Sequence, residues 1–393
     1  MPPPRILDSH IHLWPATAAN PSSHAWMTAG HPLAKQCSIA DYLSACASFP
    51  VEGFVYVETD RRVGTGASLD EWAAEPLEEL RWLRRIVEGR PREGERFGAQ
   101  DGRLMKGIVA WAPLHRGAEA FEEYVTKAGE IAGGETWGRV KGFRFLLQGI
   151  KDEKEMRELV LGEGFIGALR RFGAEGRRWC FDVGVDMRSG GIWQLEVVAE
   201  MMEKANEGTR EEERVRFVIS KIHNSLSIRG IQFLTVKIDH LCKPTFESNL
   251  DVEDQKEYER WCAAITRFSK RDIYVKLSGA FSELEDQDPS HPTPVAELVA
   301  KMQPWLDHLF AVFPPDRIVS APSTTDIMLL TIFKMFGSDW PVCNVGGPGD
   351  KLSWMHWQAV VERILEERQL PERDKDRIWY GTAVEAYRLD TSA

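Results

Sequence analysis

The first apolar run of the chain, Ile6-Leu7-Asp8-Ser9-His10-Ile11-His12-Leu13-Trp14, joins a predicted strand to two histidines at its end. Residues two apart in a strand point to the same side, so His10 and His12 share one face. Seven further β-prone runs follow: Gly53–Glu58, Lys106–Trp111, Val140–Phe145, Trp179–Val183, Phe233–His240, Ile273–Ser278 and Lys334–Ser338. Each run is apolar enough to be covered on both faces, as parallel strands require.

Longer amphipathic stretches separate these runs, for example Ile39–Phe49, Glu153–Gly173 and Val295–Phe313. Short strands that alternate with helices are typical of an α/β fold, and eight such units close a barrel. No linker or short repeat divides the sequence. We therefore predict a single (β/α)8 TIM barrel over residues 1–393, with long βα loops.

The composition restricts the partners. Sixty acidic residues against 49 lysines and arginines give a net charge of −11, which opposes binding to nucleic acid. No apolar run is long enough for a membrane span. Six cysteines without any CxxC pair, and no leader-like N-terminal segment, are typical of a cytoplasmic protein with reduced thiols. A small-molecule substrate is expected, and a homo-oligomer is compatible with this composition.

Two segments interrupt predicted strands. Val215–Ile219 is expected to continue into Asp239-His240, but residues 220–237 intervene, and Asp316–Ile318 is separated from Met335 by residues 319–334. Ser220-Lys221 and Val319-Ser320 can encode splice-donor sequences, and each segment carries a Leu-Thr pair that can encode a branch site. We interpret both segments as in-frame introns retained in a fungal gene product. Genuine loops on the face where the strands begin are the alternative. Under either interpretation, we expect barrel strands rebuilt from Phe233–Lys237 and Ile332–Lys334.

The candidate catalytic residues follow the first and last strands. Gly337-Ser338-Asp339-Trp340-Pro341 places a carboxylate after the eighth strand, beside His10 and His12 in a closed barrel. Two imidazoles and a carboxylate suit a divalent metal or the activation of water. Alone, Asp339 is more typical of a turn or a helix N-cap. The combination favours a site.

These motifs resemble those of the amidohydrolase superfamily, and within it the sugar-lactone lactonases that act on L-rhamnono- and L-fucono-lactones. The resemblance spans most of the chain and also rests on Phe54–Glu58, Lys141–Arg144, Asp239–Pro244 and Val275–Gly279. It implies a hydrolase of cyclic esters, with His10 and His12 at the electrophilic centre and Asp339 activating water. The alternatives are a metal-dependent decarboxylase of the same superfamily and a barrel made inactive by its insertions.

The resemblance also implies a divalent metal, zinc or manganese, held by His10, His12 and Asp339. Metal-dependent members usually add a histidine after strand five or a lysine after strand four, where this chain has Asp182 and Arg144. A fourth ligand is then Glu58, His240 or solvent. We expect weak, exchangeable binding, or a reaction in which histidines polarise the carbonyl without metal.

Other residues at strand ends complete the predicted site. His240 is expected to donate a hydrogen bond to the carbonyl or leaving oxygen, or else to be structural. The cations of Arg144 and Lys276 are expected to bind substrate, or else to form buried ion pairs. Glu58 is a metal ligand or a partner of one of these cations. Trp14 and Trp340 offer faces for stacking against a sugar.

Overall fold

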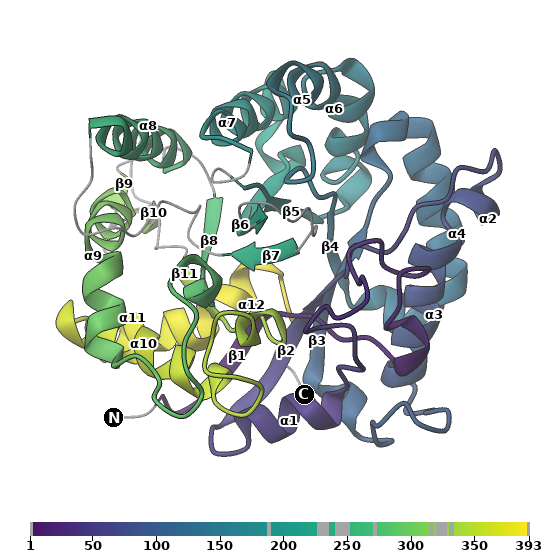
Figure 1. Cartoon of the computed structure of the whole chain (residues 1–393). Coiled ribbons are helices and arrows are strands. Elements are labelled where there is room, and N and C mark those ends of the chain that lie inside the picture. The colour runs from purple at the N-terminus through teal and green to yellow at the C-terminus, as the bar shows by residue number, and fades with distance from the viewer. Residues whose placement is uncertain are drawn as a thin grey trace.

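Eight parallel strands form a barrel in a computed structural model that describes residues 3–186, 190–225, 236–239, 252–269, 273–313, 318–319, 328–329 and 334–390 (Figure 1). In barrel order they are β1 (Ile6–Ile11), β2 (Val51–Val57), β3 (Met105–Trp111), β4 (Val140–Arg144), β5 (Cys180–Gly184), β6 (Arg216–Ser225), β8 (Ile273–Ser278) and β11 (Lys334–Gly337). The predicted TIM barrel is confirmed.

The first and last strands are joined just beyond the end of β11. The backbone N–H of Asp339 donates to the carbonyl of His10 at 2.8 Å, and the N–H of His12 donates to the carbonyl of Trp340 at 2.7 Å. These bonds continue the parallel pairing, which includes a bridge between Ile11 and Trp340. Ring closure therefore sets the two predicted motifs side by side.

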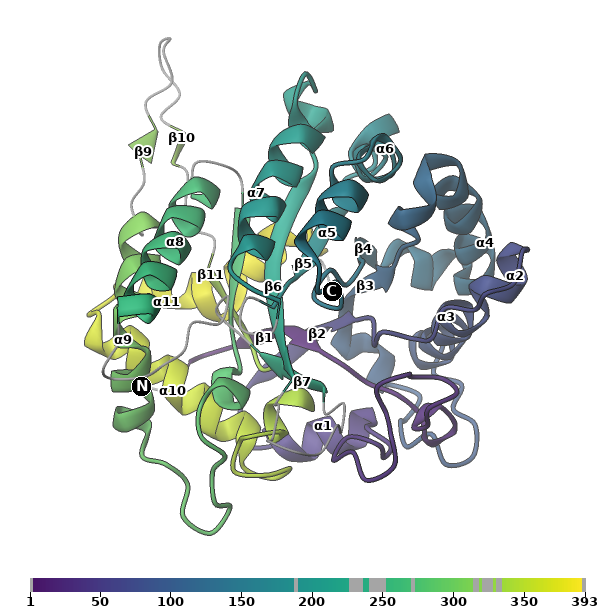
Figure 2. The same cartoon turned by 45° about the horizontal axis from the view of Figure 1, so that its top comes forward.

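The helices lie around the strands, as Figures 1 and 2 show. They are α1 (Ile39–Cys46), α2 (Leu69–Trp72), α3 (Ala74–Val87), α4 (Gly117–Gly138), α5 (Glu153–Val160), α6 (Glu163–Arg170), α7 (Trp193–Asn206), α8 (Val252–Phe268), α9 (Val295–Val312), α10 (Ser353–Glu367), α11 (Glu372–Asp376) and α12 (Thr382–Ala386). The predicted helix over Glu153–Gly173 is two helices, because Gly162 takes an extended ψ of 147° and is the N-cap before α6. Among the described residues, no helix is both long and apolar enough to span a membrane.

The prediction of Phe233–His240 as the sixth barrel strand is wrong. That position belongs to β6, where Phe217 pairs with Phe181 of β5, and Ile219 pairs with Val275 of β8. The run Arg216–Ile219 stays in the barrel because it carries apolar side chains for both faces of a covered strand. Phe217 and Val218 are almost fully buried there. Residues 236–239 form β7 (Val236–Asp239), which pairs antiparallel with the far end of β6.

At the second interrupted strand, the run after the inserted segment takes the barrel position, and the run before it is displaced. β11, which begins at Lys334, pairs with β8 in the barrel as expected. The displaced Ile318 lies in β9 (Ile318–Val319), which pairs antiparallel with β10 (Met328–Leu329) in a separate two-stranded sheet. Figure 2 shows β9 and β10 standing away from the barrel.

Candidate active site

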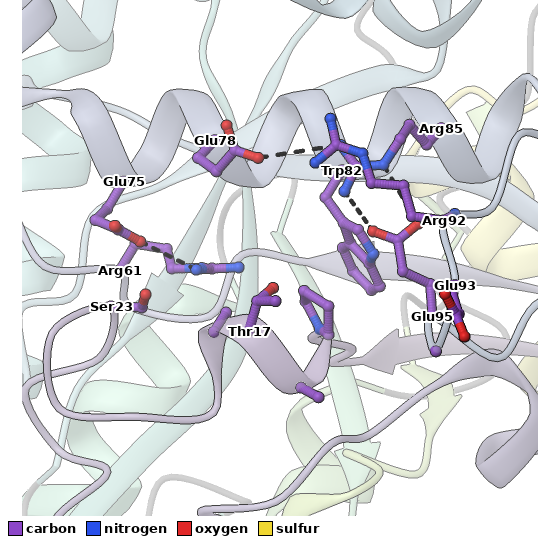
Figure 3. A pocket seen from close by; sticks show the side chains of 14 residues that line it. Thr17, Ser23, Arg61, Glu75, Glu78, Trp82, Arg85, Arg92, Glu93 and Glu95 are labelled. Atoms are coloured by element: carbon purple, nitrogen blue, oxygen red, sulfur yellow. Dashed lines mark hydrogen bonds and ion pairs between the residues drawn. The ribbon is translucent and has the colours of Figure 1, made fainter.

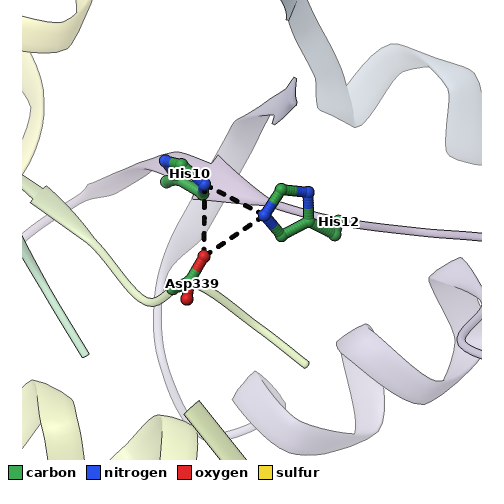
Figure 4. A group of neighbouring side chains, drawn as sticks. All are labelled: His10, His12 and Asp339. Atoms are coloured by element: carbon green, nitrogen blue, oxygen red, sulfur yellow. Dashed lines mark hydrogen bonds and ion pairs between the residues drawn. The ribbon is translucent and has the colours of Figure 1, made fainter. Parts of the chain in front are cut away.

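His10, His12 and Asp339 form one buried cluster where β1 and β11 end (Figure 4). Nε2 of His10 and Nε2 of His12 are 3.0 Å apart. They lie 3.1 Å and 3.3 Å, respectively, from the same oxygen, Oδ1 of Asp339. The side chains of His10 and Asp339 are fully buried, and that of His12 is 3% exposed. Two imidazoles and a carboxylate so close together, away from bulk water, form a site for proton transfer or metal binding.

The backbone turns sharply at Asp339. Its φ is +57°, in the left-handed region that aspartate tolerates better than most residues. The turn starts directly after Gly337, where an added Cβ would lie 3.2 Å from the Cβ of His10 and 3.2 Å from Oγ of Ser9. A glycine there lets β11 approach β1 closely enough for Asp339 to reach both imidazoles.

Asp8, which the sequence analysis did not single out, holds the two strand ends together. Its Oδ1 accepts from the backbone N–H of Ser338 at 2.8 Å, and its Oδ2 accepts from Tyr42 Oη and Trp354 Nε1, both at 3.0 Å. Burial raises the pKa of this carboxyl, and the hydrogen bonds from Ser338 and Trp354 oppose the shift. Asp8 is adjacent to the predicted motif, but its role depends on partners remote in sequence.

The ring of His12 is oriented by the backbone. Its Nδ1 lies 2.8 Å from the carbonyl oxygen of Val57 at the end of β2. A carbonyl only accepts hydrogen bonds, so Nδ1 carries the proton. In the neutral ring, Nε2 then presents a lone pair toward Asp339 and His10.

His10 is oriented by a lysine instead. Nζ of Lys276 lies 2.8 Å from Nδ1 of His10 and donates to Oδ2 of Asp182 at 2.7 Å. The hydroxyl of Tyr387 donates to the same carboxylate oxygen at 3.1 Å. Burial lowers the pKa of Lys276, and Asp182 opposes that shift. Of the two roles left open for Lys276, the structure shows the buried ion pair. Neither Asp182 in this role nor Tyr387 has a signal in the sequence.

Arg144 also forms a buried ion pair. Its Nε donates to Oε1 of Glu58, and its Nη2 donates to the Glu58 carbonyl, both at 2.5 Å. The other carboxylate oxygen of Glu58 accepts from the backbone N–H of Asp60 at 2.6 Å. Glu58 is therefore a partner of Arg144 and is not part of the His10–His12–Asp339 cluster. Nη1 of Arg144 is buried, and none of the residues that the structure describes accepts a hydrogen bond from it.

The two tryptophans of the predicted site are buried. Trp14 donates through Nε1 to the carbonyl of Lys35 at 2.6 Å and packs edge-on against Trp26, with ring centroids 5.7 Å apart. Trp340 is 3% exposed and packs against Tyr42. Its indole Nε1 has no acceptor within the described part of the chain. His240, the remaining predicted residue, lies outside the described residues.

The donor set fits a metal only in part. His10 Nε2, His12 Nε2 and a carboxylate oxygen of Asp339 lie within 4.8 Å of one another, as three ligands of an open site do. His12, with its proton on Nδ1, suits a ligand. His10 does not, because a metal-ligating histidine donates its other N–H to an acceptor, whereas its Nδ1 faces the amine of Lys276.

A separate cavity of about 370 Å³ lies between the loop after β1 and α3 (Figure 3). Its lining includes charged side chains already paired with one another. Arg61 lies 3.1 Å from Glu75, and Arg85 contacts both Glu78 and Glu95. None of the three clustered residues lines it. The cavity is thus distinct from the site at the barrel mouth.

Comparison with known proteins supports the resemblance seen in the motifs. Over 392 residues, 98% of this chain and 99% of the relative, the chain is 27% identical to L-rhamnono-gamma-lactonase of Scheffersomyces stipitis. The chain is similar to sugar-lactone lactonases. The resemblance stated from the motifs is confirmed. A second relative, L-fucono-1,5-lactonase of Burkholderia multivorans, is 27% identical over 157 residues, 40% of this chain and 44% of the relative.

No protein-family model matches the chain. Among solved structures, 2,6-dihydroxybenzoate decarboxylase in complex with 2,6-dihydroxybenzoate aligns with 99% of this chain and 100% of its own, with a TM-score of 0.43 and 11% identity. The decarboxylase from Rhizobium aligns with 99% of both chains, with a TM-score of 0.45 and 11% identity.

Proposed function

We propose that the chain is a hydrolase that opens a sugar-acid lactone of the L-rhamnono- or L-fucono-lactone type. The observation that carries the proposal is the buried cluster in which one oxygen of Asp339 lies 3.1 Å and 3.3 Å from two imidazole nitrogens. It stands at the C-terminal ends of the strands, where TIM-barrel enzymes carry their active sites. The similarity to a lactonase along nearly the whole chain supports the substrate class.

The reaction needs a base and a hydrogen-bond donor. Asp339 accepts a proton from water as the water oxygen bonds to the lactone carbonyl carbon. His12, with its lone pair on Nε2, accepts a hydrogen bond from the same water and orients it. The ring N–H of His10 donates a hydrogen bond to the carbonyl oxygen, where negative charge develops.

The second half of the reaction returns the proton. As the bond between the carbonyl carbon and the ring oxygen breaks, Asp339 gives its proton to the leaving oxygen, which becomes a hydroxyl. Lactone and water thus become the open aldonic acid, with no net change in the protein. His240 is proposed as an additional donor to the leaving oxygen.

Substrate hydroxyls need polar partners in the same mouth. Nη1 of Arg144 is buried and has no partner among the described residues, and a donor in that state gains a full hydrogen bond when a substrate oxygen arrives. The indole N–H of Trp340 is in the same situation. We assign both groups to substrate binding, whereas Lys276 and Glu58 act within the protein.

We also propose where the enzyme acts and how it assembles. A cytoplasmic location, a role in carbohydrate metabolism, a fungal origin and a homo-oligomeric state are proposed from the sequence. Zinc or manganese is proposed to bind weakly at the cluster, and no step above depends on it.

A panel of substrates tests the function. The purified chain is expected to release acid from L-rhamnono- and L-fucono-lactones, as followed by a pH indicator, and to release no CO₂ from aromatic acids. CO₂ without lactone opening would replace the proposal by a decarboxylase of the same superfamily. Activity on neither class would leave an inactive barrel.

A further inference from the structure

We propose that Lys276 is a positioning residue that keeps the ring proton of His10 on Nε2, so that His10 is a hydrogen-bond donor and not a metal ligand. The catalytic consequence rests on the proposed lactonase function. The position of the proton does not, and it is measured separately.

Asp182 and Tyr387 stabilise the ammonium of Lys276 against the burial that lowers its pKa. Its side chain and that of Asp182 are fully buried, and the two form an ion pair at 2.7 Å. The hydroxyl of Tyr387 adds a donor to the same carboxylate oxygen, which fixes the orientation of Asp182. The Tyr387 ring centroid is also 5.5 Å from Nζ of Lys276. A carboxylate and an aromatic face together compensate a buried cation.

An ammonium has hydrogens to donate and no lone pair to accept with. The 2.8 Å contact between Lys276 Nζ and His10 Nδ1 is therefore a bond that Lys276 donates. Nδ1 must hold a lone pair, and the proton of the neutral ring lies on Nε2. That proton faces Nε2 of His12, 3.0 Å away, and Oδ1 of Asp339 lies 3.1 Å from the same His10 nitrogen.

The two histidines therefore take opposite tautomers. His12 carries its proton on Nδ1, because it bonds to the Val57 carbonyl, and His10 carries it on Nε2. The resulting arrangement is complementary, with an N–H of one ring facing a lone pair of the other across 3.0 Å. A metal between the rings needs lone pairs from both, so ligation by His10 requires the loss of a proton or of the Lys276 hydrogen bond.

This arrangement assigns the oxyanion donor. In the reaction, the lactone carbonyl oxygen accepts a hydrogen bond from the N–H of His10, and Lys276 strengthens that donor by drawing electron density at Nδ1. Metal binding is expected to be weak because strand five carries no histidine. The proton on His10 Nε2 is a second cause of weak binding.

The primary test uses the unaltered protein. Long-range ¹H–¹⁵N NMR spectra of histidine-labelled protein, at one neutral pH, are expected to show His10 protonated at Nε2 and His12 protonated at Nδ1. His10→Gln and His12→Gln samples assign the signals. A His10 ring protonated at Nδ1 would overturn the proposal.

Lys276→Met gives the second test, with Lys334→Met, which removes another buried lysine, as the matched control. Lys276→Met frees Nδ1 of His10 to hold the ring proton when zinc takes Nε2, so zinc binding is expected to tighten at least tenfold by titration. The substitution is also expected to lower kcat by about 10–100-fold with KM nearly unchanged. Lys334→Met is expected to change none of these. Unchanged zinc affinity and unchanged kcat in folded Lys276→Met would refute the role of Lys276. A wild-type spectrum as predicted, in a protein inactive on every lactone, would refute the proposed function alone.

Discussion

At the scale of single residues, Asp339 has the most demanding role, because it must take a proton from water and return it. Asp339→Asn keeps the size of the side chain and removes the base. Loss of general base catalysis is expected to lower kcat/KM on the best lactone by about 10²–10⁴-fold, as measured by initial rates. Asp41→Asn, at a helix N-terminus away from the cluster, is the control. Activity within a few-fold of wild type in Asp339→Asn would assign the base to another group.

Asp8 is predicted to stabilise the fold around the site. Its two oxygens accept hydrogen bonds from Ser338, Tyr42 and Trp354. In Asp8→Asn an NH₂ group replaces one oxygen and faces these donors, so hydrogen bonds are lost. We expect a loss of about 1–3 kcal/mol in the free energy of unfolding, measured by urea denaturation. Asp70→Asn, at a side chain that is 70% exposed, is expected to change stability by less than about 0.5 kcal/mol. Equal stability of Asp8→Asn and wild type would contradict this role.

At the scale of elements, the sequence predicts most of the barrel because each parallel strand is an apolar run between two amphipathic helices. It fails at strand six, where two β-prone runs compete. Arg216–Ile219 occupies the place between β5 and β8, and Val236–Asp239 pairs instead with the far end of β6. Period and propensity do not distinguish such runs, since the choice depends on which of them pairs with both neighbouring strands.

Lys334, the first residue of β11, lowers the stability of the fold because its amine is buried. Lys334 is buried, donates to the Phe313 carbonyl at 2.6 Å and lies over the ring of Phe310. Burial, with Arg368 adding to it, lowers the pKa of Lys334 from 10.5 to about 7. Between these two pKa values, the unfolded chain binds a proton that the folded chain does not. The free energy of unfolding therefore rises with pH across this window.

Lys334→Met is expected to remove that pH dependence. At pH near 7 the substitution should stabilise the protein by about 2 kcal/mol or more, because a Lys pKa lowered this far opposes folding by several kcal/mol and Met keeps most of the packing. Thermal denaturation at neutral and alkaline pH measures both effects. Lys154→Met, at an 84% exposed side chain, is the control. If Lys334→Met melts at the wild-type temperature at both pH values, burial of this amine does not lower the stability of the fold.

At the scale of the whole molecule, ring closure makes the site. His10 on β1, Arg144 on β4, Asp182 on β5 and Lys276 on β8 come from strands far apart in sequence, yet they form ion pairs and hydrogen bonds near one mouth. The sequence predicts that these residues end strands, because motif and period are local. It leaves open whether each cation binds substrate or a carboxylate, because that depends on which strands are neighbours and on Tyr387 from the end of the chain.

The two inserted segments are tested on the whole chain. Deletion of 220–237 joins Ile219, which already pairs with β5 and β8, directly to Ile238-Asp239-His240. Deletion of 319–334 joins Ile318 to Met335 and removes the buried Lys334. If the segments are retained introns, the doubly shortened chain is expected to extend strand six into His240, to melt at a higher temperature and to open lactones at least tenfold faster.

The single deletions separate the two effects. Removal of 319–334 alone should act mainly on stability, through the loss of a buried lysine, and removal of 220–237 alone should act mainly on kcat, through His240. His240→Gln in the shortened chain is expected to cancel the gain in kcat. A shortened chain that fails to fold or loses activity, beside an active full-length chain, would show instead that both segments are genuine parts of the protein.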